Sequence, residues 1–146
     1  MSISQQNLSK DQLVLDTLRL SDEEWYDCVS RLDRDAAHAT VSRERRSEER
    51  IPYRNLSTLL VTIRSPDGRQ LNYRARPYDL SRSGIGFLHG TFIHLGLDID
   101  VHLKHREAGM VNLHAQIRCC FHIRNTIHRI GAQFDSPIDV DDYLLA

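Results

Sequence analysis

Residues 113–124 alternate between apolar and polar side chains at every position, and this pattern constrains the fold more than any other feature of the sequence. The apolar series is Leu113, Ala115, Ile117, Cys119, Phe121 and Ile123, and the other series is His114, Gln116, Arg118, Cys120, His122 and Arg124. A period of two that persists this long predicts a half-buried antiparallel strand and excludes an amphipathic helix. Cys119 is accordingly expected to face the core and Cys120 the polar side.

Shorter segments repeat the alternation elsewhere in the chain. The apolar positions are Leu59, Val61 and Ile63; Leu71, Tyr73 and Ala75; Val101 and Leu103; and Ile130, Ala132 and Phe134. The first two groups are separated by Ser65-Pro66-Asp67-Gly68, a typical turn sequence. About six short strands with glycine-bearing turns predict a mainly β fold, a small antiparallel barrel. Residues 137–146 are expected to form a short C-terminal helix that closes it.

The first 40 residues have a different pattern. Ser9 to Gln12 and Ser21 to Glu24 both fit the capping box, in which a hydroxyl and the side chain three residues later satisfy the first backbone donors of a helix. After the second box, apolar residues recur at helical spacing, namely Trp25, Cys28, Val29, Leu32 and Ala36. Residues 1–40 are therefore predicted to form one or two amphipathic helices, whose Trp25 stripe packs on the barrel or binds a partner.

Charge divides the chain into three parts. The net charge is -4 over residues 1–40, +5 over 41–82 and -2 over 83–146, and all but two of the 19 basic residues are arginines. Residues 41–54 are rich in arginine and glutamate and have little to bury, which predicts a mobile linker. The expected organisation is a helical extension (1–40), an arginine-rich linker (41–54) and a β-barrel domain (55–146). Arginine suits phosphates and guanine edges, so the basic segment indicates a local anion site.

Composition narrows the class of protein further. No apolar run approaches the ~20 residues of a membrane helix, and the first ten residues lack the apolar core of a signal peptide. Three cysteines, two of them adjacent, do not make a disulfide framework. A cytoplasmic globular protein is therefore expected.

Two short motifs stand at informative positions. Arg46 to Arg50 is an R-x-x-x-R directly before the first predicted strand, and Asp79 to Gly84 is a D-x-S-x-x-G at the end of the second. Together, with Pro52, Ile85-Gly86-Phe87 and residues 130–134, they resemble the PilZ domain family, bacterial receptors for cyclic di-GMP. The resemblance covers roughly residues 43–146 and implies a six-stranded PilZ-like barrel and a role as an effector without catalysis.

The resemblance implies a ligand-binding site for cyclic di-GMP, whose residues are Arg45, Arg46, Arg50, Asp79, Ser81 and Gly84. The two phosphodiesters and the O6 and N7 acceptors of guanine suit arginine, and a carboxylate can accept from guanine N1–H and the 2-amino group. In the family, an arginine at the position of Arg45 accompanies binding of two stacked ligands, so two molecules per chain are expected. Surface ion pairs for the arginines and a plain turn for Asp79, Ser81 and Gly84 are the alternatives.

The sequence favours neither a metal site nor an enzyme. It contains no H-E-x-x-H, no C-x-x-C and no G-x-S-x-G, and no cofactor is expected. Two rival functions remain open. One is a PilZ-fold protein–protein adaptor that does not bind nucleotide, and the other is a general RNA-binding barrel, although its stacking platform is absent from the sequence. The downstream protein partner is not identified.

Overall fold

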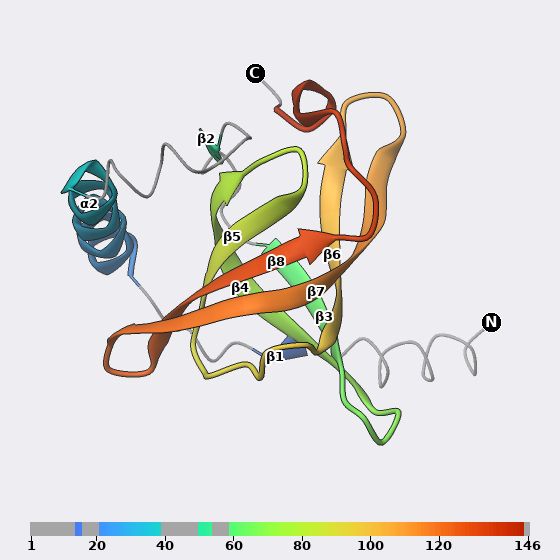
Figure 1. Ribbon diagram of the computed structural model, residues 1–146, viewed down its shortest axis with the longest axis horizontal. Coiled ribbons are helices and arrows are strands. Elements are labelled where there is room, and N and C mark those ends of the chain that lie inside the picture. The colour runs from blue at the N-terminus through green and yellow to red at the C-terminus, as the bar shows by residue number, and fades with distance from the viewer. Residues whose placement is uncertain (1–13, 16–20, 39–49, 54–58, 145–146) are drawn as a thin grey trace.

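A computed structural model of the chain describes residues 14–15, 21–38, 50–53 and 59–144, and six antiparallel strands form its body (Figure 1). They are β3 (Leu59–Arg64), β4 (Gln70–Leu80), β5 (Gly84–His89), β6 (Asp98–His105), β7 (Gly109–Arg124) and β8 (Ile127–Phe134). Hydrogen bonding runs in the order β4-β3-β6-β7-β8-β5, and β5 pairs again with β4. The sheet is therefore a closed barrel, and the predicted mainly β fold is confirmed.

The barrel interior is filled by the alternating apolar residues. Val61 on β3, Val101 on β6, Ile117 on β7 and Ile130 on β8 are each no more than 1% exposed and belong to one cluster. The neighbouring residues of each strand point outward, as the period of two requires. The long β4 closes the barrel because its first half pairs with β3 and its second half with β5.

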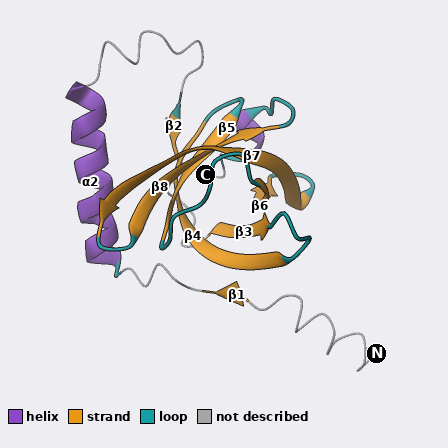
Figure 2. Cartoon of the chain, turned by 60° about the horizontal axis from the view of Figure 1, so that its bottom comes forward, coloured by secondary structure: helices purple, strands orange, loops and turns teal. Residues whose placement is uncertain are grey.

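Two very short strands add to β4 outside the six (Figure 2). β1 (Val14–Leu15) pairs in parallel with Asn72 and Tyr73, and β2 (Ile51–Pro52) pairs antiparallel with Asp79 and Leu80. The prediction of a helix after the capping box at Ser9 is therefore wrong at residues 14–15, where the backbone pairs with β4. The box itself lies outside the described residues. Residues 51–52, placed in the predicted linker, are tied to the barrel.

The second predicted helix is confirmed as α2 (Asp22–His38), which lies beside the barrel (Figure 1). The capping box forms as expected, since the backbone N–H of Glu24 donates to Ser21 Oγ at 3.1 Å. The apolar stripe packs against the outside of the barrel in a second cluster, whose buried members are Trp25, Cys28, Val29, Tyr78, Leu88 and Ile127. An ion pair of 2.8 Å between Arg76 and Asp22 joins the same two surfaces. Arg76 thus serves helix docking.

A β-bulge in β7 interrupts the alternation on which the sequence prediction rests. The register with β8 shifts between Ile117 and Cys119, because one extra residue lies on β7 at that point. Beyond the bulge, the positions predicted to face the core face outward, and those predicted to face outward face the core. Cys120 packs against the barrel core, whereas Phe121 is 58% exposed. The expectation that Cys119 faces the core and Cys120 the polar side is therefore wrong.

The C-terminal segment closes one end of the barrel. The short helix expected there is a single 3-10 turn, Val140–Asp142, and Tyr143 behind it is buried in the barrel core. Among the described residues, no helix is both long and apolar enough to cross a membrane.

Candidate ligand-binding site

Asp79 is a buried carboxylate on the outer side of the barrel wall, near the end of β4. The residue is 7% exposed, and its neighbours in register are Pro52 on β2 and Gly86 on β5. A buried carboxylate is costly unless it is paired with a cation or hydrogen-bonded. Asp79 therefore needs cationic or donor partners, and the structure supplies two.

Arg50 is the first partner. Its Nη1 lies 3.3 Å from Asp79 Oδ1, in an ion pair between residues 29 positions apart. Two features of the following residues fix this approach. Pro52 pairs with Asp79, and the backbone N–H of Tyr53 donates to the carbonyl of Tyr78 at 3.0 Å, while the Tyr53 ring is buried in the core. The structure thus brings together the second arginine of the first motif and the aspartate of the second.

Arg129 is the second partner, and the sequence analysis missed it. Its Nη2 lies 3.5 Å from Asp79 Oδ2, the other oxygen of the same carboxylate. Arg129 lies on β8, which is separated from β4 by β5, so its side chain reaches across one strand. A signal was available: since Ile130, Ala132 and Phe134 face the core, Arg129 must face outward.

Ser81 and Gly84 form the turn between β4 and β5. The hydroxyl of Ser81 accepts from the backbone N–H of Gly84 at 3.2 Å, and Ser81 is 1% exposed. A Cβ at Gly84 would overlap the carbonyl oxygen of Ala132, so glycine is required there because β8 lies close. These two residues shape the loop that follows Asp79. Arg45 and Arg46 lie outside the described residues.

One glycine borders the carboxylate on the neighbouring strand β5, and a second glycine is its register partner on β8. A Cβ at Gly86 would overlap Oδ1 of Asp79, and a Cβ at Gly131 on β8 would overlap Sγ of Cys119. Glycine within a strand often marks the close approach of another group. At Gly86 that group is the carboxylate itself, so the position of Asp79 depends on the missing side chain.

Among the residues that the structure describes, the site has an excess of positive charge. Two guanidinium groups face one carboxylate, and the exposed fractions of the side chains are 33% for Arg50, 17% for Arg129 and 11% for Asp79. Each carboxylate oxygen has two lone pairs, so an oxygen that accepts from one arginine retains a second acceptor position. The arrangement can therefore attract an anion and accept hydrogen bonds from it. Within the described ranges, no three His, Cys, Asp or Glu side chains group closely enough to hold a metal ion.

The model of the PilZ domain family matches residues 44–145. Because this match spans well over half of the sequence, the chain belongs to the PilZ domain family. The match begins near the first motif and runs through the barrel almost to the last residue. No curated protein sequence matches the chain.

Several solved structures are similar to this chain. The PilZ domain of YcgR from Escherichia coli with c-di-GMP is 22% identical, with a TM-score of 0.49, over 62% of this chain and 78% of that one. The inhibitor of motility MotI/DgrA from Bacillus subtilis is 19% identical, with a TM-score of 0.46, over 67% and 46%. The K. pneumonia MrkH–c-di-GMP complex is 20% identical, with a TM-score of 0.47, over 68% and 47%. The alignment spans less than half the length of the last two.

Proposed function

We propose that this protein is a receptor for cyclic di-GMP and that it acts as an effector without catalysing a reaction. The observation that carries the proposal is the ion pair between Arg50 and Asp79, at 3.3 Å. It joins one residue from each of the two motifs on which the likeness to the family rests. The second arginine on Asp79 adds the positive charge that a ligand with two phosphodiesters requires.

The chemistry of the ligand fits these groups. Arginine binds phosphate through a charge-assisted fork, and it binds the O6 and N7 edge of guanine with two hydrogen bonds. The carboxylate of Asp79 offers acceptors for N1–H and the 2-amino group of guanine. Adenine has no such pair of donors, so with adenine the acceptor positions that Asp79 offers to the base would have no partner.

The arginine-rich linker is the moving part in this proposal. Ligand phosphates offset the repulsion among Arg45, Arg46 and Arg50 and fix the segment against the barrel. Ordering the segment next to α2 changes the surface that the protein presents to a downstream partner. The arginine at position 45 supports binding of two stacked ligand molecules, whose four phosphate charges require an additional cation.

Calorimetric titration tests the ligand and its stoichiometry together. We expect saturable binding of cyclic di-GMP at two molecules per chain, and much weaker binding of cyclic di-AMP. Arg50→Ala should weaken binding at least about tenfold, because a charge-assisted contact is lost. The control Arg106→Ala removes an arginine paired with Asp142, at 3.6 Å, and should bind as the wild type does.

Each other outcome identifies a rival. If the protein is folded but binds no cyclic di-GMP, it is instead the adaptor that does not bind nucleotide. If bulk RNA displaces the ligand at physiological salt, the protein is instead a general RNA-binding barrel. One ligand per chain contradicts the stacked pair alone.

A further inference from the structure

Arg129 is held in place by two consecutive residues of β4. Its guanidinium carbon lies 5.3 Å from the centre of the Tyr78 ring, and its Nη2 lies 3.5 Å from Asp79 Oδ2. Consecutive strand residues normally point to opposite faces. Here the register with β5 shifts between Pro77 and Asp79, and this bulge lets both side chains reach the same guanidinium.

Tyr78 is a firm support for that guanidinium. The residue is 5% exposed, it packs in the cluster that includes Trp25 and Leu88, and its hydroxyl donates to Asp33 Oδ1 on α2 at 2.9 Å. A guanidinium over an aromatic face gains electrostatic attraction that increases as water is excluded. The Tyr78 ring and the Asp79 carboxylate together therefore define the position of the Arg129 guanidinium.

The carboxylate of Asp79 is held from two sides. Arg50 lies at Oδ1 and Arg129 at Oδ2, and Gly86 leaves room for Oδ1 on the neighbouring strand. A carboxylate contacted at only one oxygen can rotate about its terminal bond, since that torsion is broad. Two guanidinium groups at different oxygens restrict the rotation. Of the two, Arg129 is the more buried and lies within a regular strand.

We propose that Arg129 is a positioning residue for guanine recognition: it fixes the plane of the Asp79 carboxylate so that both oxygens accept from guanine N1–H and the 2-amino group. This inference rests on the proposed function, because it assigns a role within that site. It predicts that loss of Arg129 reduces the preference for guanine in particular. A general loss of positive charge would weaken all related ligands alike.

The experiment compares cyclic di-GMP with cyclic di-IMP, its analogue without the 2-amino groups, in calorimetric titrations of the full chain. The wild type should prefer cyclic di-GMP by about tenfold, the value of one hydrogen bond to a charged acceptor. Arg129→Gln should bring this ratio close to one, because it weakens cyclic di-GMP more than cyclic di-IMP, although both ligands lose the attraction of the Arg129 charge. The control Arg64→Gln, at an arginine paired with the buried Asp100, should keep the wild-type ratio.

A second variant separates the proposed role of Arg129 from a failure of the protein to fold. Arg129→Lys keeps the positive charge beside Asp79 but lacks the planar fork, so its ratio should lie between those of the wild type and Arg129→Gln. Thermal unfolding checks that each variant is folded. An unchanged ratio in both variants, or equal weakening of both ligands, overturns the role of Arg129. A wild type that binds neither ligand overturns the proposed function instead.

Discussion

Asp79 and Asp100 are two buried aspartates on the outside of the same barrel, and their surroundings differ. Their exposed fractions are similar, 7% and 5%, and each is paired with an arginine. In register, Asp100 on β6 lies between Thr62 and His114, which both carry side chains, whereas Asp79 lies beside Gly86. Burial and ion pairing alone therefore do not distinguish a binding site from a structural contact.

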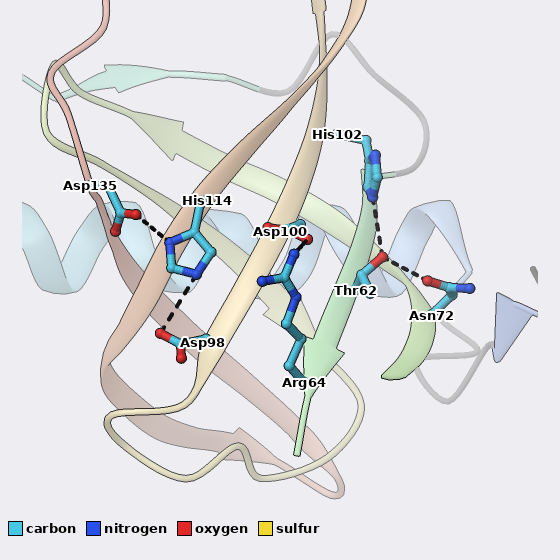
Figure 3. Close-up of polar contacts among 8 residues, drawn as sticks. All are labelled: Thr62, Arg64, Asn72, Asp98, Asp100, His102, His114 and Asp135. Carbon is cyan, nitrogen blue, oxygen red and sulfur yellow. Dashed lines mark hydrogen bonds and ion pairs between the residues drawn. The ribbon is translucent and has the colours of Figure 1, made fainter. Parts of the chain in front are cut away.

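The charge balance around the two aspartates is opposite. Figure 3 shows Arg64 against Asp100, and His114 between Asp98 and Asp135. Carboxylates outnumber arginines in that group, so it has no excess positive charge for an anion. At Asp79 two guanidinium groups face one carboxylate. Among the described residues, arginine charge that carboxylates do not balance, together with an adjacent glycine, therefore marks the candidate site.

The largest expected difference is between Asp79→Ala and Asp100→Ala. Asp79→Ala should weaken cyclic di-GMP binding about 100-fold or more, since two hydrogen bonds to a charged acceptor are lost. Asp100→Ala should leave binding within about threefold and lower the free energy of unfolding by about 1–3 kcal/mol. Calorimetry and urea unfolding measure the two effects. Equal loss of binding in both variants would remove the distinction between the two aspartates.

An intermediate effect is expected from Gly86→Ala. The added methyl would overlap Asp79 Oδ1, so the carboxylate must move, and binding should weaken by about tenfold. Gly131→Ala is the matched control, because its methyl meets Sγ of Cys119 on the neighbouring strand. It should lower stability and change affinity less than Gly86→Ala does. The reverse order of the two affinities would refute the importance of the space beside Asp79.

The smallest effect concerns pH and involves two histidines, His102 on β6, the strand of Asp100, and His89 on β5. Burial lowers the pKa of His102 from its ordinary value of 6.5, although Asp100 partly opposes this, and burial likewise lowers the pKa of His89. The unfolded chain therefore binds protons at a higher pH than the folded chain does. Stability is complete above about pH 6.5 and decreases as the pH falls below it, by at most about 1.4 kcal/mol per pH unit for each histidine.

Urea unfolding at several pH values measures this dependence. His102→Gln should reduce the slope of unfolding free energy against pH between pH 6.5 and 5, because the variant lacks that titrating group. Asp79→Asn serves as the comparison at the other aspartate and should retain the histidine-dependent slope. Stability that increases on acidification through this range would contradict the account.

Much of the fold could be predicted because its signals are local. The alternation of Leu59, Val61 and Ile63 and the capping box at Ser21 each depend on a few neighbouring residues, and both have the expected structure. The faces of β7 were predicted correctly only as far as Ile117. A bulge is set by how two strands match in register, which the alternation within one strand does not contain.

The candidate site divides in the same way. Arg50 and Asp79 could be assigned to one site from the sequence, because their motifs are recognisable segments. Arg129 could not, because its contact crosses β5 between residues 50 positions apart, and no motif surrounds it. Gly86 and Gly131 are further signals in the sequence, because glycine within a strand indicates that another group approaches closely. They do not indicate which group this is.

The central claim is tested most directly by titrating the isotope-labelled full chain with cyclic di-GMP and following the amide chemical shifts by NMR. This titration reports on both aspartates in one molecule of the wild-type sequence. The account predicts saturable shifts concentrated at Asp79, Gly84, Gly86 and Arg129, with little change at Thr62 and Asp100. Shifts centred on β3 and β6, or none at saturating ligand, would contradict it.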